Sequence, residues 1–195
     1  MTMDLQKFGI KLFFQPNGSY PSRDFIPELH RWIQNDSIPQ HMLIDVVDYS
    51  HIPDGPGIML IAHEGQFSFD LENNQPGVFY LRKTKLNGNF EERIHSVLNT
   101  AVHSAGLIQK NEFGKEVQFL NNSFRFIAND RRLAQNNKEN QELYSDAFES
   151  YFNKNYPGSK WELENFTEGE ERLAFTVNFQ DDTDLLKSVE EGKNE

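Results

Sequence analysis

The feature that most constrains the fold is a succession of short apolar segments separated by turn-forming residues. Eight segments have the length and the β-branched or aromatic content that are typical of strands. Three longer segments repeat their apolar residues at the spacing of amphipathic helices. Their order along the chain is β-α-β-β-β-β-α-β-α-β-β. This order predicts an α+β fold, in which a mostly antiparallel sheet carries its helices on one face.

Turn-forming residues such as Gly, Pro and Asn mark the boundaries of these elements. Strands are expected at 8–14, 42–48, 57–64, 66–71, 77–83, 117–129, 161–166 and 172–179. Helices are expected at 25–35, 90–109 and 141–156. Ser22 is the expected cap of the first helix, and a break is expected in the sixth strand at Asn121-Asn122. The second and third strands are expected to form a hairpin in which Asp48 lies opposite Gly57.

The two ends of the chain share one element order. Strand, helix, strand and strand follow one another in residues 8–64 and again in residues 122–179. Residue identity between the two units is negligible, so chance recurrence of a common arrangement explains the pattern as well as duplication does. If the repeat is real, two βαββ units are related by a pseudo-two-fold axis inside a single domain that covers residues 1–180.

The composition is that of a folded protein. Of the 195 residues, 37% are hydrophobic, and the 17 Phe, 6 Tyr and 2 Trp are too many for a disordered chain. No window approaches the roughly 18 to 20 apolar residues that a membrane span requires. The first five residues have neither the basic nor the apolar segment of a signal peptide. We therefore expect a soluble, cytoplasmic protein that has no membrane partner.

Charge and cysteine content exclude several function classes. The net charge is −11 and no stripe of Lys and Arg interrupts the acidic sequence, so no nucleic-acid partner is expected. The absence of cysteine excludes disulfides, a thiolate nucleophile and cysteine-ligated metals.

Part of the acid excess lies in residues 181–195, which are expected to form an acidic, flexible tail. Leu185, Leu186 and Val189 are too few to hold that tail in place.

The loop between the predicted hairpin strands is the most distinctive candidate site. Asp48, His51 and Asp54 lie in it with two prolines and two glycines, which stiffen the loop so that its amides and His51 can receive an anion. The alternative explanation is ordinary turn chemistry with an exposed His51. Because His51 and His63 fall at opposite ends of the hairpin, about 20 Å apart, neither a metal nor a cofactor is predicted.

Asp45 lies in a strand whose neighbours are apolar on both faces, so the pattern predicts that it is buried. A buried carboxylate requires an ion pair or hydrogen bonds, for which Arg31 and Arg82 are candidates. An exposed face shared with a partner subunit is another explanation. Buried carboxylates also occur at catalytic sites. The alternative function is therefore a metal- or carboxylate-assisted hydrolase that uses Asp45, Asp48, His51 and Asp54.

A second polar segment lies at the end of the strand predicted at 117–129. Asn129, Asp130 and Arg131 follow this strand, and side chains of these types can clamp a polar ligand. The alternative explanation is a set of Asx-turns with an arginine paired to a neighbouring acid.

Two strings resemble those of a group of bacterial proteins of uncharacterised function. One string is HIPDGPG at 51–57, followed by HEG at 63–65, and the other is NDRRLA at 129–134 with Asn136. The resemblance covers about residues 25–140. It implies a bacterial, cytoplasmic protein, and it brings no activity, cofactor or catalytic residue with it.

The leading prediction is a non-catalytic module that binds a small polar molecule or anion, or a protein partner. A homodimer through apolar sheet or helix surface is compatible with this prediction. The second prediction is the hydrolase, and the third is a structural protein whose acidic body and tail dock to a basic partner. The ligand site of the leading prediction combines Asp48, His51, Asp54, Asn129, Asp130 and Arg131.

Overall fold

A computed structural model describes residues 4–16, 20, 23–52, 55–165, 171–180 and 183–186. In this part of the chain, eight strands form one antiparallel sheet in the order β2-β3-β4-β5-β1-β6-β8-β7. The predicted α+β class is confirmed. The helices are α1 Ile26–Gln34, α2 Phe90–Lys110 and α3 Lys138–Asn155. The strands are β1 Phe8–Phe14, β2 Leu43–Asp48, β3 Ile58–Ala62, β4 Gly65–Asp70, β5 Gly77–Arg82, β6 Phe119–Ala128, β7 Trp161–Asn165 and β8 Ala174–Phe179.

Local hydrogen bonds explain where two helices begin. Asn89 and Glu92 form a reciprocal capping box at the start of α2, with bonds of 2.9 and 2.7 Å. Asn137 accepts from the backbone of Asn140, so α3 begins three residues before the predicted start at 141. The predicted cap of α1, Ser22, lies outside the described residues, and a short 3₁₀ turn at Arg23–Phe25 precedes that helix.

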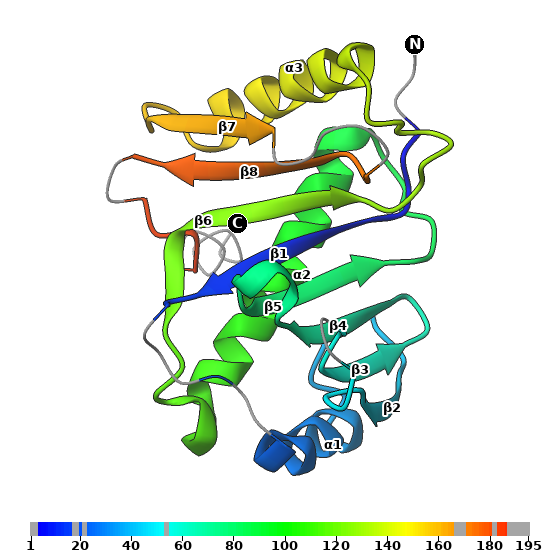
Figure 1. Cartoon of the computed structure of the whole chain (residues 1–195), viewed down its shortest axis with the longest axis vertical. Coiled ribbons are helices and arrows are strands. Elements are labelled where there is room, and N and C mark those ends of the chain that lie inside the picture. The colour runs from blue at the N-terminus through cyan, green and yellow to red at the C-terminus, as the bar shows by residue number, and fades with distance from the viewer. Residues whose placement is uncertain are drawn as a thin grey trace.

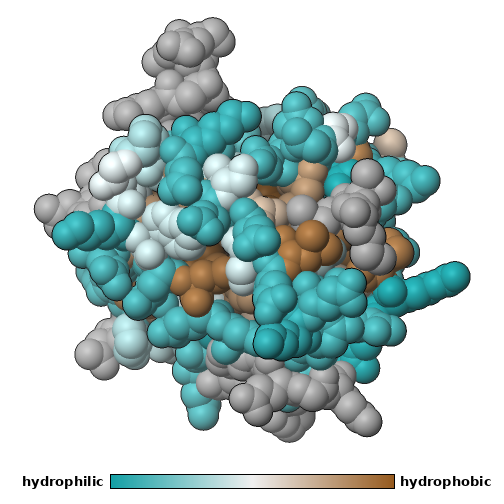
Figure 2. Space-filling model, turned by 90° about the horizontal axis from the view of Figure 1, so that it is seen from above, coloured by the Kyte–Doolittle hydropathy of each residue, from teal (hydrophilic) through white to brown (hydrophobic). Residues whose placement is uncertain are grey.

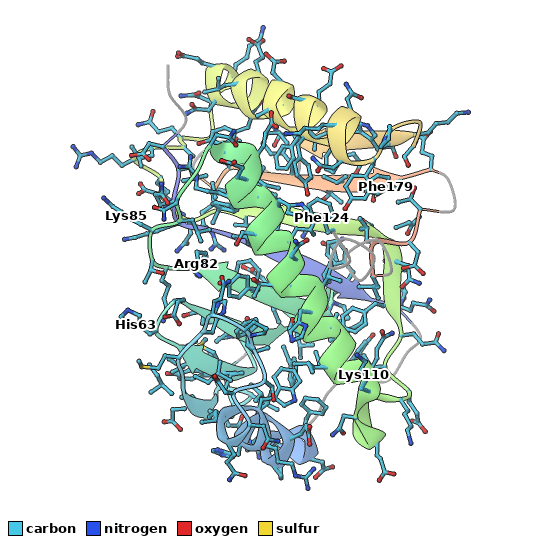
Figure 3. All side chains as sticks on the ribbon, turned by 180° about the vertical axis from the view of Figure 1, so that it is seen from behind. His63, Arg82, Lys85, Lys110, Phe124 and Phe179 are labelled. Carbon is cyan, nitrogen blue, oxygen red and sulfur yellow. The ribbon has the colours of Figure 1, made fainter. Side chains whose placement is uncertain are left out.

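All three helices pack on one face of the sheet (Figure 1), as predicted, and α2 crosses that face diagonally (Figure 3). Aromatic side chains dominate the contact. The ring of Phe126 in β6 lies 6.2 Å from that of Phe90 in α2 and 5.2 Å from that of Phe148 in α3. Leu29 and Trp32 bury α1 against the same core.

The outer surface on the α3 side is mostly hydrophilic, with smaller apolar areas near its centre (Figure 2). Of the helices in the described ranges, none is long and apolar enough to cross a membrane.

Strand β6 is one continuous element, so the two short strands predicted here are a single strand. Its pairing with β1 is nevertheless interrupted at the predicted place. Leu12 pairs with Phe124 and Phe14 with Phe119, so residues 120–123, which include Asn121-Asn122, form a bulge in β6.

The strand order does not confirm the proposed repeat. In the second unit β8 lies directly beside β6, whereas in the first unit β4 and β5 separate β3 from β1. The β4–β5 hairpin takes this position because β5 pairs with β1 along five residues, from Gly9–Leu81 to Phe13–Gly77. Residues 8–64 and 122–179 therefore differ in topology, although each contributes a helix to the same face of the sheet.

Residues 183–186 belong to the folded body. Leu185 is fully buried in the main core, and Leu186 packs against that core. Asn121 donates to Asp184 at 3.2 Å, and the hydroxyls of Ser159 and Thr183 lie 2.9 Å apart. The tail was expected to begin at residue 181, but these four residues pack against the body through two leucines and two polar contacts. Residues 181, 182 and 187–195 lie outside the described residues.

We expect Leu185→Ala to lower the free energy of unfolding by about 2–4 kcal/mol, because the change removes a fully buried side chain and leaves a cavity. Leu133→Ala is the matched control, since Leu133 is 49% exposed and its loss should cost less than about 0.5 kcal/mol. Urea unfolding of both variants measures the difference. Equally small losses would show that residues 183–186 are not docked in solution.

Candidate functional site

The sheet face opposite the helices carries a row of polar side chains. The register pairs Glu164 of β7 with Thr176 of β8, and Thr176 with Arg125 of β6. Arg125 in turn lies opposite Lys11 of β1. Lys11, Arg125 and Thr176 are buried, whereas Glu164 is exposed. Two like charges directly opposite each other are unfavourable, so neighbouring groups have to compensate for them.

Asp70, at the end of β4, compensates for Lys11. The Nζ of Lys11 donates to Oδ2 of Asp70 over 2.9 Å, and both side chains are buried. Oδ1 of Asp70 accepts from the backbone N–H of Glu72 at 2.8 Å, which fixes the carboxylate. Burial lowers the pKa of Lys11, and the charge of Asp70 opposes that shift. The pair is a structural ion pair beside Arg125.

Arg125 is held from two sides. Its guanidinium carbon lies 5.0 Å from the centre of the Phe13 ring, which is a cation–π geometry. Its Nε donates to Oγ1 of Thr176 at 3.2 Å, and only 4% of the residue is exposed. Burial lowers the pKa of Arg125 to about 10, so the guanidinium still carries its charge at neutral pH.

Arg125 lines a cavity of about 430 Å³ at the end of the sheet where β1 ends and β6 begins. Hydroxyl and amide groups of Ser123, Thr176 and Asn178 form the wall beside it, and Ser123 Oγ donates to Asn178 Oδ1 at 2.7 Å. Among the described lining residues, Glu164 supplies the one carboxylate. The remaining apolar lining comes from Phe13, Phe14, Pro16, Tyr20, Pro76 and Leu120.

Strand β6 carries a bulge beside this cavity. Leu12 pairs with Phe124 and Phe14 with Phe119, so one residue of β1 lies opposite residues 120–123 of β6. Leu120 and Ser123, in this irregular part of β6, line the cavity together with Phe13 and Phe14 at the end of β1. Irregularities of this kind are frequent next to binding sites.

The lining of the cavity suits recognition better than acid–base chemistry. A planar, charged guanidinium beside two hydroxyls can bind a carboxylate or phosphate, and the aromatic rings can contact an apolar part of the same ligand. The described lining residues include no histidine and no second carboxylate. This part of the cavity therefore lacks the paired acid and base of a hydrolase.

The candidate residues Asp48 and His51 lie at the β2 edge of the sheet, where Asp48 ends β2 and His51 lies in the turn that follows. Asp48 accepts from the N–H of Ser50 at 2.9 Å and from the Ser50 hydroxyl, and its Oδ2 lies 2.7 Å from Nε of Arg23. Hydrogen bonds from Ser50, and then the charge of Arg23, lower the pKa of Asp48. His51 is exposed, and Asp54 lies outside the described residues. Asp48 thus makes the local turn contacts that the alternative explanation of this loop predicted.

The residues that follow β6 also make local turns. Oδ1 of Asp130 accepts from the backbone N–H groups of Arg132 and Leu133, at 3.1 and 3.2 Å. Asn129 accepts from Nη1 of Arg172 at 3.3 Å, and Arg131 is exposed. Asp130 therefore forms an Asx-turn, which is the alternative explanation that was given for this segment.

The two predicted segments are not brought together into one site. Strands β2 and β6 are five positions apart in the sheet, roughly 24 Å at about 4.8 Å per strand. They also run in opposite directions, so Asp48 and Asn129 lie at opposite ends of the sheet. Neither segment lines the cavity beside Arg125.

The predicted burial of Asp45 is wrong. Strand β2 is an edge strand, and Asp45 is exposed and accepts from the backbone N–H of Val46 at 2.8 Å. The predicted register is also wrong by one residue, because the shift between Leu43 and Asp45 pairs Asp45 with Ile61 instead of Leu60. In the described parts of the chain, no three His, Asp or Glu side chains are grouped closely enough to hold a metal ion.

His41 forms a second buried polar contact, at the other end of the hairpin. Its Nδ1 donates to the carbonyl of Pro39 at 2.8 Å, so its Nε2 accepts from the Tyr80 hydroxyl at 2.6 Å. Glu64 accepts from the backbone N–H of Met42 at 2.7 Å. Burial lowers the pKa of His41, which favours its neutral form.

The sequence predicts the strand that carries Arg125 but gives the residue no role. A strand at 117–129 is predicted correctly, but nothing in its pattern assigns a role to a cation between Phe124 and Phe126. Lys11 lies in the same setting, within the apolar strand FGIKLFF. Lys11 and Arg125 lie side by side only because β1 pairs with β6. The sequence pattern does not predict that pairing.

Comparison with known proteins adds no assignment. No protein-family model matches the chain, and no curated protein matches it. The function must therefore be argued from the geometry of the site.

We expect Lys11→Met to lower the free energy of unfolding by about 3–5 kcal/mol, because it leaves the Asp70 carboxylate buried without its cation. The double variant Lys11→Met/Asp70→Asn removes both charges and should recover most of the loss. Urea unfolding of the two single variants and the double variant measures the coupling. Additive losses would show that the pair does not form.

We expect the free energy of unfolding to fall as the pH decreases from 6.5, the ordinary pKa of histidine, to the lowered pKa of His41. In this window the unfolded chain binds more protons than the folded one, so acid favours unfolding, and the loss levels off below the lowered pKa. Burial also lowers the pKa of His95, which adds to the same slope. His41→Gln should therefore give a flatter pH dependence in urea unfolding. An unchanged slope would contradict this assignment.

Proposed function

We propose that this protein is a non-catalytic module that binds a small organic anion in the cavity beside Arg125. The observation that carries the proposal is a buried, charged guanidinium in the cavity wall, fixed by Thr176 and Phe13. Charge-assisted hydrogen bonds are about twice as strong as neutral ones and are strengthened further where water is excluded. A carboxylate or phosphate in the cavity gains such bonds from a group that is already in position.

The remaining lining supports a ligand with an apolar part. The volume of about 430 Å³ lies within the range of about 300–1,000 Å³ that is typical of small-molecule sites. Phe13 and Tyr20 offer ring surface, and Ser123 and Thr176 offer hydroxyls for orientation. A carboxylate or phosphate attached to a ring or a short hydrocarbon fits this combination.

The proposal keeps the class of function predicted from the sequence and changes its site. Asp48 and Asp130 use their carboxylates in local turns, and Asn129 bonds to Arg172. Of the four residues of the hydrolase alternative, Asp45 is exposed on the edge strand and Asp48 is bonded within its turn. No observation favours it over binding.

We expect Arg125→Met to weaken binding of 3-phenylpropionate and phenyl phosphate by about tenfold or more, since the variant removes the cation but retains an apolar stem of similar length. Arg125→Lys should lie between this variant and the wild type, because it keeps a charge but loses the planar fork. Calorimetric or NMR titration of each probe gives the affinities.

Arg131→Met is the matched control, because Arg131 is exposed and lies away from the cavity. It should bind both probes as the wild type does, and circular dichroism should show that all variants are folded. The proposal fails if the wild type binds neither probe at millimolar concentration. It also fails if folded Arg125→Met binds the probes as tightly as the wild type.

A further inference from the structure

We infer that the ligand of this cavity is a zwitterion of the amino-acid or short-peptide class, with its carboxylate at Arg125 and its ammonium group at Glu164. The inference rests on the proposed function and specifies its ligand. It comes from the position of Glu164, a carboxylate that lines the same cavity as the buried guanidinium.

Glu164 and Arg125 stand in one row of the sheet, on either side of Thr176. Their backbones are two strand spacings apart, roughly 9.6 Å at about 4.8 Å each. Thr176, between them, accepts from the Nε of Arg125 at 3.2 Å and lines the same cavity. Groups of opposite charge therefore border one cavity of about 430 Å³.

A ligand that contacts both groups must carry an anionic and a cationic group of its own within one small molecule. Amino acids and short peptides have this combination. An aromatic or apolar side chain can then contact Phe13, which packs against Arg125.

The two charges also select against simpler ligands. A plain carboxylate is attracted by Arg125 and repelled by Glu164, and a plain amine is repelled by Arg125. A zwitterion in the stated orientation is attracted by both groups, which is how opposite charges in one site produce specificity. Because Glu164 is exposed, solvent and salt screen its charge, and its effect on affinity should be smaller than that of Arg125.

Three related probes test the inference: phenylalanine has both charges, 3-phenylpropionate lacks the amine, and phenethylamine lacks the carboxylate. We expect the wild type to bind phenylalanine most tightly and phenethylamine most weakly in calorimetric titrations at neutral pH. Glu164→Gln should weaken phenylalanine binding by up to about fivefold. The same variant should bind 3-phenylpropionate at least as tightly as the wild type, because the repulsion is gone.

Glu162→Gln is the matched control. Glu162 is also in β7, opposite Asn178, and accepts from Gln180 at 3.0 Å, but it does not line the cavity. It should change the affinity for none of the three probes. Because Glu164 is exposed, its substitution should leave the fold intact.

The outcomes separate the ligand class from the function on which it rests. If 3-phenylpropionate binds through Arg125 but phenylalanine binds no more tightly, or if Glu164→Gln leaves both affinities unchanged, the zwitterion class is wrong and anion binding stands. If neither acid binds the wild type, the proposed function fails as well. Weaker binding of both acids to Glu164→Gln would also overturn the inference, because it would show a role that is not electrostatic.

Discussion

Strand β1 holds the sheet together, because within the described chain it alone joins the strands β2 to β5 to the strands β6 to β8. All seven of its residues are buried. One side of the strand packs its aromatic and aliphatic residues against the helices, and the other side contributes Lys11 and Phe13 to the opposite face. A strand paired on both edges and covered on both faces exposes nothing to water, so any charge on it must be compensated within the protein.

That constraint shapes the polar face of the sheet. Lys11 is paired with Asp70, and this pair lies beside Arg125 in the next strand. The aromatic ring of Phe13 and the hydroxyl of Thr176 then fix the guanidinium of Arg125. Strand β1 thus supplies Lys11, the cation of the ion pair, and Phe13, the ring that contacts the Arg125 guanidinium. A change in its register against β6 would separate these groups and remove the cavity wall.

The bulge in β6 lies next to the cavity of the proposed function. Residues 120–123 of β6 form the bulge opposite Phe13 of β1, and Leu120 and Ser123 line the cavity. Phe13 and Phe14, at the end of β1, add an aromatic wall to the lining. The cavity joins this wall to the buried cation of β6 and to the exposed carboxylate of β7. The chemistry of the proposed ligand therefore depends on which strands are neighbours in the sheet.

The sequence by itself determined the elements, because turn residues and apolar periodicity are local properties. It predicted β6 and α2 with nearly correct ends and the single helical face of the sheet. The register at Asp45, the burial of Leu185 and the meeting of Arg125 with Phe13 and Thr176 are tertiary properties. A bulge, an edge position and a docked leucine depend on packing between segments far apart in the chain. For this reason only the tertiary structure decided where a ligand could bind.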